Sequence, residues 1–211
     1  MEMTEDYQFS FFRKPIHNTE PIRAVGIVDI YRYIVGHYAE PQTKALRMLE
    51  DRKEAKRYKT ANFDFCCFSG LFRKRCEREL LMHSGLMCID FDHVADLAKL
   101  KKQLLGNEYF DTELLFVSPS GNGLKWIIPV ALQGMEHSRY FKAVANCLES
   151  SGLPKVDRSG CDVSRSCLLP YDPNAYINPK YEDDVKENIF RARLGECRYI
   201  STLLNERTMY G

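Results

Sequence analysis

The sequence has no long apolar run. None of its hydrophobic stretches approaches the roughly 18 consecutive apolar residues that mark a membrane-spanning helix. The amino terminus is acidic over residues 1–6 and lacks the basic and apolar regions of a secretory signal peptide. These two absences predict a globular, cytoplasmic protein with no membrane partner.

The sequence also lacks paired cysteines and an excess of charge of one sign. Its 8 cysteines include no C-x-x-C pair and no other spacing typical of zinc ligands, so we expect reduced thiols. Its 30 basic and 29 acidic residues exclude a globally basic, histone-like DNA binder.

Basic residues nevertheless gather between residues 44 and 78. They predict a surface that contacts the phosphate backbone of a nucleic acid, and an ordinary solvated face is the alternative. The predicted contact residues are Lys53, Lys56, Arg57, Arg73, Lys74 and Arg75.

Hydrophobic periodicity predicts strands mingled with helices along the whole chain. The predicted strands cover residues 7–14, 63–68, 86–93, 114–118, 123–130 and 165–169. The predicted helices cover residues 26–38, 41–58, 77–82, 94–105, 136–148 and 196–205. This order favours an α+β fold over a doubly wound parallel sheet.

An apolar run that begins at Leu86 ends in two carboxylates, Asp90 and Asp92. In a strand, the period of two places both carboxylates on one face. Two carboxylates in one small volume repel each other unless a cation, most simply a divalent metal, lies between them. The alternative is that the strand ends at Ile89 and that the aspartates cap the helix that follows.

A Gly-rich turn at residues 118–123 joins two apolar segments and is followed by Lys125. Glycine leaves backbone N–H groups open to phosphate, and a nearby lysine adds positive charge. The spacing matches neither the Walker loop nor the Rossmann fingerprint. A plain hairpin turn with an outward-facing lysine is the alternative. The predicted nucleotide-binding residues of this turn are Ser118, Ser120, Gly121, Gly123 and Lys125.

The segment 156–165 offers a third carboxylate, from Asp157 or Asp162, and a guanidinium, from Arg165, that can hold a phosphate with two hydrogen bonds. Loop caps and a surface ion pair are the alternative. Together with Asp90 and Asp92, these groups predict phosphate chemistry on Mg²⁺ or Mn²⁺. Such an ion neutralises phosphate oxygens and lowers the pKa of an attacking hydroxyl.

In their order and approximate spacing, these motifs resemble the VirE N-terminal-like domain family of bacterial mobile elements. That family is similar to the archaeo-eukaryotic primase, or prim-pol, superfamily. The resemblance covers residues 63–178. It is carried by Asp90-x-Asp92, the turn that ends with Lys125, Val156-Asp157, Arg165 and the segment 168–173.

The resemblance implies an RRM-like, mostly antiparallel sheet with helices on one face, joined to a smaller N-terminal αβ module. It implies an N-terminal module at residues 1–84 and a primase-type catalytic core at residues 85–180. Residues 181–211 are expected to form a helical extension.

The resemblance also assigns roles to site residues. Asp90, Asp92 and Asp157 match the catalytic metal ligands of the superfamily, with Asp162 as a reserve ligand. Arg165 matches the basic residue that follows the third motif. Lys125 stands where the superfamily has a histidine that contacts nucleotide phosphate.

Two hypotheses follow from the resemblance. The first is a primase-polymerase-like domain of a mobile-element replication protein, which binds a nucleoside triphosphate and a single-stranded DNA or RNA template and works with a helicase domain or protein. The second is a non-catalytic nucleic-acid-binding module with a degenerate primase fold. A metal-dependent nuclease is a third, weaker hypothesis.

Overall fold

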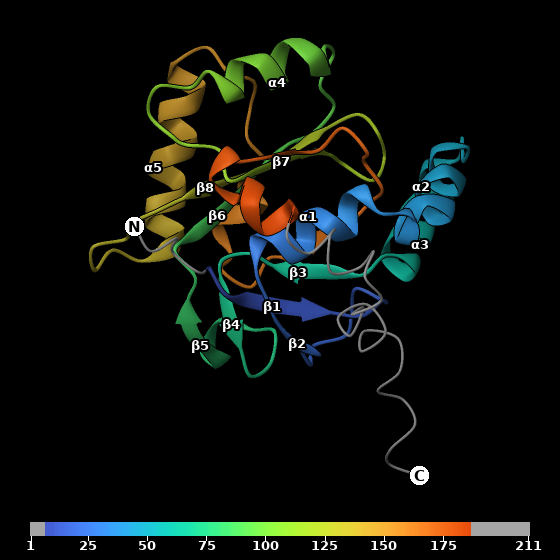
Figure 1. Cartoon of the computed structure of the whole chain (residues 1–211), viewed down its shortest axis with the longest axis horizontal. Helices are drawn as coiled ribbons and strands as arrows, with labels where there is room; N and C mark the ends of the chain where they lie inside the picture. Colours follow the sequence, from blue (N-terminus) through green and yellow to red (C-terminus); the bar gives the residue numbers. More distant parts are fainter. Residues whose placement is uncertain (1–6, 187–211) are drawn as a thin grey trace. The chain divides into compact units, whose positions relative to one another are not determined.

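The computed structural model describes residues 7–186, which form helices mixed with antiparallel sheets (Figure 1). The predicted α+β class is therefore confirmed. Residues up to Ile177 form one compact unit, and a second unit begins at Asn178. In the second unit the structure describes a 3-10 turn, Pro179–Tyr181, and helical residues 182–186. The predicted helix at residues 196–205 and most of the predicted C-terminal extension lie outside the described residues.

The first sheet has the strand order β2-β1-β3-β9, and all neighbouring strands are antiparallel. Its strands are β1 (Phe9–Phe12), β2 (Arg23–Val25), β3 (Phe65–Cys67) and β9 (Cys167–Leu168). Strand β9 comes from the segment assigned to the core, so the chain returns at residue 167 to complete a sheet begun by its N-terminal residues. The division at residues 84 and 85 stays a prediction.

Three helices lie between β2 and β3: α1 (Ile27–Val35), α2 (Glu40–Arg47) and α3 (Arg52–Asn62). Buried apolar side chains hold the α2–α3 pair on the first sheet. Leu46 of α2 joins a core cluster with Phe12 and Phe65, whose rings stack with centroids 4.9 Å apart. Ala55 and Tyr58 of α3 pack against the same cluster.

The second sheet has the strand order β10-β7-β8-β6, again antiparallel. Its strands are β6 (Leu86–Phe91), β7 (Leu114–Val117), β8 (Leu124–Pro129) and β10 (Tyr176–Ile177). Helices α4 (Leu97–Leu105) and α5 (His137–Ser150) cover one face. Alternate residues of β6, such as Ile89 and Phe91, share a core cluster with Leu100 of α4 and Phe141 of α5.

The other face of the second sheet meets the first sheet. Because side chains alternate along a strand, Cys88 and Asp90 of β6 point away from α4 and α5. The Sγ atoms of Cys88 and Cys167 lie 3.9 Å apart and so join β6 to β9 across the two sheets. All the cysteines in the described residues are free thiols, as predicted. Cys197 lies outside the described residues.

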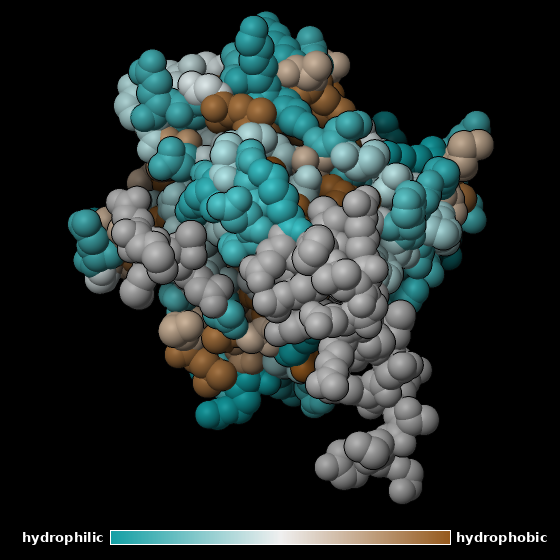
Figure 2. Space-filling model, viewed as in Figure 1, coloured by the Kyte–Doolittle hydropathy of each residue, from teal (hydrophilic) through white to brown (hydrophobic). Residues whose placement is uncertain are grey.

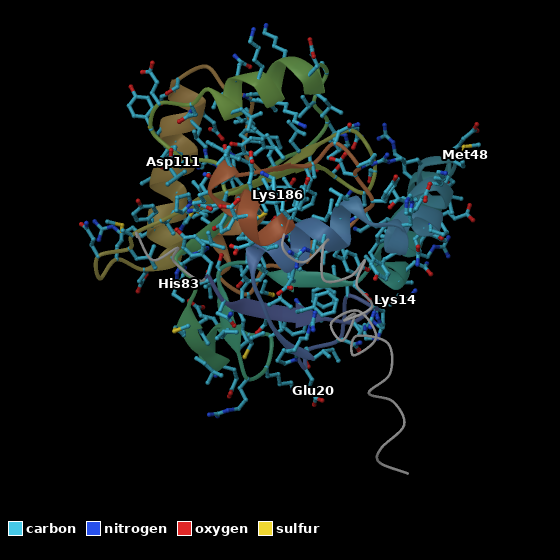
Figure 3. All side chains as sticks on the ribbon, in the orientation of Figure 1. Lys14, Glu20, Met48, His83, Asp111 and Lys186 are labelled. Atoms are coloured by element: carbon cyan, nitrogen blue, oxygen red, sulfur yellow. The ribbon has the colours of Figure 1, made fainter. Side chains whose placement is uncertain are left out.

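Two predicted helices are wrong in their extent. The helix expected over residues 41–58 is two helices, because Asp51 caps a new one by accepting a hydrogen bond from the Glu54 N–H at 2.7 Å. The exposed residue Met48 marks the break between α2 and α3 (Figure 3).

The helix expected over residues 77–82 is also wrong. A 3-10 turn at Glu77–Glu79 leads into strand β5 (Leu80–His83), which pairs with β4 (Gly70–Phe72). A Cβ atom on Gly70 would lie 2.6 Å from the Met82 carbonyl oxygen, so the two strands approach closely because residue 70 is glycine. This pairing partner decides the conformation of residues 80–83.

Many of the described residues on the face drawn in Figure 2 are hydrophilic. An apolar patch lies over β5, where Leu81 and Met82 are exposed (Figure 2). No helix among residues 7–186 is long and apolar enough to cross a membrane.

Candidate metal and phosphate site

Three carboxylates meet where β6 ends. Asp90 is the last but one residue of β6, Asp92 follows the strand, and Asp157 lies in a loop after α5. The N–H of Asp157 donates a hydrogen bond to the Asp90 carbonyl oxygen at 2.9 Å, which attaches this loop to the strand. One carboxylate oxygen from each residue lies within 4.8 Å of the others. The predicted convergence of Asp90, Asp92 and Asp157 is confirmed.

The alternative role of the two aspartates, capping the next helix, is wrong. Helix α4 begins at Leu97 rather than at residue 94, and its N-cap is Asp96, whose Oδ1 accepts from the Lys99 N–H at 2.9 Å. His93 has a positive φ of 54° and turns the chain between the strand and this cap. Asp90 and Asp92 are therefore free of a capping role.

The Gly-rich turn lies against the end of β6. A Cβ atom on Gly123 would come within 2.5 Å of the Phe91 carbonyl oxygen, so only glycine allows this approach. The Val94 N–H donates to the Asn122 carbonyl oxygen at 2.8 Å. Arg47 of α2 holds the turn from the other side by donating to the carbonyl oxygens of Pro119 and Ser118 at 3.2 and 3.3 Å.

Some backbone N–H groups of the turn already donate hydrogen bonds to carbonyl oxygens of the same turn. The Ser118 N–H donates to the Gly123 carbonyl oxygen at 2.8 Å, and the Gly121 N–H donates to the Ser118 carbonyl oxygen at 2.9 Å. Gly121 has a φ of 80°, as a hairpin turn requires, and Ser120 is exposed. Ser118 and Gly121 therefore cannot offer these N–H groups to a phosphate.

Lys125 lies opposite Asp90 in the register of β6 and β8, and its ammonium forms an ion pair with Asp90 Oδ2. Both side chains are nearly buried, with exposed fractions of 13% and 11%. The other oxygen, Asp90 Oδ1, is buried and accepts no hydrogen bond. A buried carboxylate oxygen without a partner is costly, and a metal ion bound there would satisfy it.

The carboxylate set fits a divalent cation. Mg²⁺ and Mn²⁺ prefer oxygen ligands, and one ion with bonds of about 2.1 Å spans oxygens about 4.2 Å apart. The three oxygens all lie within 4.8 Å of one another, which is close to this span. Asp90, Asp92 and Asp157 would hold the ion.

Hydrogen bonds keep Asp157 ionised. Its Oδ1 accepts from the Ser159 N–H at 2.9 Å and its Oδ2 from the Ser159 hydroxyl at 2.5 Å. Arg165 adds a longer contact of 3.4 Å to Oδ2. Burial alone would raise the pKa of Asp157, but the Ser159 hydrogen bonds and the charges of Arg165 and Lys125 lower it below its usual value.

The reserve ligand Asp162 is not part of the carboxylate set. Its Oδ1 accepts from both the N–H and the hydroxyl of Ser164, each at 2.8 Å. These bonds stabilise the turn that leads to Arg165. Asp162 therefore supports the loop, and the reserve ligand is not needed because Asp157 supplies the third carboxylate.

Lys59 of α3 is a site residue that the sequence patterns did not single out. It is half-buried, and burial lowers its pKa, as do the positive charges of Lys125 and Arg165, while Asp92 raises it. The charges of Lys125, Asp92 and Arg165 thus all act on Lys59. In the sequence it is one more cation in a basic helix, and no local signal distinguishes it. Arg47, which holds the turn, was missed for the same reason.

The predicted nucleic-acid contact residues fall in two places. Lys53, Lys56 and Arg57 are exposed on α3, whereas Arg73 and Lys74 are exposed in the connection from β4 to β5. Arg75 is used inside the protein, because its guanidinium donates to the carbonyl oxygens of Ile16 and Asn18 and lies 5.4 Å from the Phe65 ring centroid.

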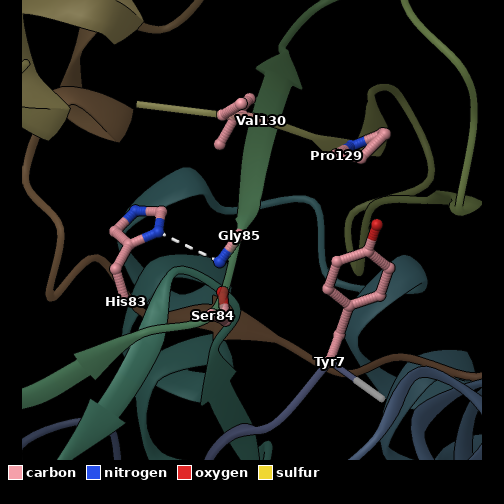
Figure 4. Close-up of a pocket in the computed structure, with 7 residues that line it drawn as sticks. Tyr7, His83, Ser84, Gly85, Pro129 and Val130 are labelled. Carbon is pink, nitrogen blue, oxygen red and sulfur yellow. Dashed lines mark hydrogen bonds between the residues drawn. The ribbon is translucent and has the colours of Figure 1, made fainter. Parts of the chain in front are cut away.

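A separate pocket of about 500 Å³ lies where β5 passes into β6 (Figure 4). It is lined by Tyr7, His83, Ser84, Gly85, Pro129, Val130 and Ala131. None of the three clustered carboxylates lines it.

The model of one protein family, described as BT4734-like, N-terminal domain, matches residues 58–177. This match covers more than half of the chain. The chain belongs to the BT4734-like N-terminal domain family. Within this BT4734-like domain the match runs from the end of α3 to β10, and it includes all three clustered carboxylates, Lys59, Lys125 and Arg165. No curated protein and no solved structure matches the chain.

Proposed function

We propose that this BT4734-like domain is a primase-polymerase-like module of a mobile-element replication protein. It binds a nucleoside triphosphate and Mg²⁺ or Mn²⁺, and it transfers nucleotides along a single-stranded DNA or RNA template in the cytoplasm. A helicase domain or protein is the expected partner. The resemblance of the three motifs to VirE N-terminal-like and prim-pol sequences supports the proposal.

The observation that carries this proposal is the meeting of the three carboxylates beside three cations. Asp90, Asp92 and Asp157 share one small volume, and the charges of Lys59, Lys125 and Arg165 act on the same place. A divalent metal bound by the carboxylates supplies charge stabilisation of phosphate oxygens and activates a hydroxyl nucleophile. The chain's own cations would orient the phosphates of the nucleotide.

The sheet supports the same reading. An antiparallel four-stranded sheet with α4 and α5 on one face is consistent with the RRM-like core of the prim-pol superfamily. Asp90 and Lys125 are cross-strand neighbours on the other face, and Asp92, just after β6, is exposed. Because one fold can serve many functions, it is the carboxylates and cations of the site that support an activity.

One observation favours the second function, a nucleic-acid-binding module without turnover. The Lys125 ammonium pairs with Asp90 Oδ2 and so takes one oxygen that a metal would otherwise use. A lysine held among carboxylates can replace the charge of a metal ion. The exposed cations Lys53, Lys56 and Arg57 on α3 would serve such a module as backbone contacts.

Primer synthesis separates the two functions. We expect the protein to join labelled nucleotides into an oligonucleotide on single-stranded DNA with Mn²⁺ or Mg²⁺. The double variant Asp90→Asn/Asp92→Asn should not form this oligonucleotide product. The matched control is Asp111→Asn, an exposed carboxylate outside the cluster (Figure 3). Product that persists in the double variant contradicts the catalytic assignment. Salt-sensitive DNA binding without any product supports the binding module instead.

A further inference from the structure

Lys59 differs from every other cation of α3. Arg52, Lys53, Lys56 and Arg57 are exposed, whereas Lys59 is half-buried. The ammonium of Lys59 makes no ion pair or hydrogen bond with any residue among 7–186, although Asp92 lies near enough for its charge to act on Lys59. Partial burial of an ammonium without a partner is unfavourable, because the ammonium loses hydration. A bound anion would offset this desolvation free energy.

The neighbours of Lys59 are mostly positive. The charges of Lys125, Arg165 and Lys56 all act on it, and only Asp92 opposes them. Lys125 is neutralised by Asp90, and Arg165 reaches Asp157 only at 3.4 Å. Lys59 and Arg165 are therefore two cations whose positive charge is not fully compensated by carboxylates. Like charges brought together in a folded protein mark a place for an anion.

The protein backbone holds Lys59 in place. The Ile16 N–H donates to the carbonyl oxygen of Thr60, the next residue, at 2.8 Å. On the other side of Lys59, Tyr58 packs against a core cluster of the first sheet that includes Val163 and Leu168, which flank Arg165 in the sequence. The last turns of α3 are thus attached to the sheet, next to the segment that carries Arg165, so the backbone of Lys59 needs no further ordering when a ligand binds.

We propose that Lys59 and Arg165 form a binding site for the terminal phosphates of a nucleoside triphosphate, next to the carboxylates. This inference rests on the proposed function and names the part of its site that binds the triphosphate. It assigns a role to a residue of the N-terminal helices, because Lys59 reaches the site from α3 while Arg165 comes from the loop before β9.

Charge balance supports a triphosphate over a nucleic-acid backbone. Lys125 is paired with Asp90, which leaves Lys59 and Arg165 as two cations that act on each other. The terminal phosphates of a triphosphate carry several negative charges in one place and match two cations, whereas a single backbone phosphate carries one. The exposed cations Lys53 and Arg57 are better placed for a backbone, since they face solvent.

The test is binding of magnesium-free tripolyphosphate in the presence of a chelator, measured by calorimetry on the whole chain. Lys59→Met should weaken binding by about 10-fold to 100-fold, the effect of removing one charge-assisted hydrogen bond. Lys53→Met, on the exposed part of the same helix, should bind as the unmodified protein does. Lys59→Arg should restore most of the affinity, which shows that the charge rather than the fold was lost.

Two further measurements distinguish the outcomes. Equal tripolyphosphate affinity in Lys59→Met and the unmodified protein would falsify the inference. If Lys59→Met weakens only the binding of a single-stranded oligonucleotide, Lys59 contacts a backbone and the inference is also overturned. A separate Mn²⁺ titration tests the proposed function, because absence of Mn²⁺ binding with intact tripolyphosphate binding refutes the metal chemistry and leaves the phosphate site standing.

Discussion

Lys125 and Asp90 are the two side chains on which the chemistry of the site depends. The register of β6 and β8 makes them direct cross-strand neighbours, and both are nearly buried. A buried ion pair has a large desolvation cost, and the loss of either partner leaves an uncompensated charge. The ammonium and a metal ion would therefore compete for the same carboxylate.

We predict that Lys125→Met changes both the affinity for Mn²⁺ and the stability of the metal-free protein. Mn²⁺ should bind more tightly, because Asp90 Oδ2 becomes available as a ligand, and the metal-free protein should lose about 2 to 4 kcal/mol of stability. Spin-resonance titration of Mn²⁺ and urea unfolding in chelator measure the two effects. Lys102→Met, an exposed change on α4, is the control. Weaker Mn²⁺ binding in Lys125→Met would show that the lysine helps to build the metal site.

Among the elements, the junction of β5 with β6 is joined to α5 by a relay of neutral histidines. The Gly85 N–H donates to His83 Nδ1 at 3.0 Å, so His83 carries its proton on Nε2 (Figure 4). That Nε2–H donates to His137 Nδ1 at 3.1 Å, and His137 Nε2–H then donates to the Gly160 carbonyl oxygen at 3.3 Å. Every ring nitrogen is used, and an additional proton would break one of these bonds.

The relay should make stability depend on pH. Burial and the His137 charge lower the pKa of His83 to about 4, and burial lowers that of His137, although the Gly160 hydrogen bond and the charges of Asp162 and Glu77 oppose this. The unfolded chain, with histidine pKa values near 6.5, binds more protons below that pH. Stability is therefore present above about pH 6.5 and falls as the pH approaches 4.

Urea unfolding at pH 7.5 and pH 5 checks this prediction. We expect a loss on the order of 1 kcal/mol at pH 5, a modest value because the His83 ring is partly exposed. His83→Gln, which does not titrate, should reduce this pH dependence, whereas the exposed His17→Gln should leave it unchanged. An identical pH dependence in His83→Gln and the unmodified protein would mean that other groups cause it.

For the whole molecule, the carboxylate site connects parts of the chain that are far apart in sequence. Asp90 and Asp92 come from the second sheet, Asp157 follows α5, and Lys59 belongs to α3 beside the first sheet. A ligand that binds all of them stabilises only the folded chain. Metal binding and global stability are therefore linked.

Thermal unfolding in Mn²⁺ tests this linkage. At a concentration 100 times the dissociation constant, Mn²⁺ should stabilise the protein by about 2.7 kcal/mol and raise Tm by about 5 to 10 °C. Asp90→Asn/Asp92→Asn should abolish the shift, and Asp111→Asn should retain it. An equal rise in Tm in the double variant would place the bound Mn²⁺ elsewhere.

The sequence by itself determined the elements whose pattern is strong and local. Three elements have the secondary structure that their hydrophobic periodicity predicts. They are the strand that contains Asp90, the hairpin around residues 118–123 and helix α5. The adjacent carboxylates Asp90 and Asp92 could be proposed as a pair because the two-residue period of a strand is a local property.

Only the tertiary structure decided what depends on partners distant in sequence. Residues 80–83 became a strand because β4 lies beside them, and Asp157 rather than Asp162 joined the carboxylates because its N–H bonds to Asp90. Pairing Lys125 with Asp90 needed the β6–β8 register, and bringing Lys59 to the site needed α3 packed on the first sheet. Local periodicity contains no information on such contacts, because they form only when separate elements pack together.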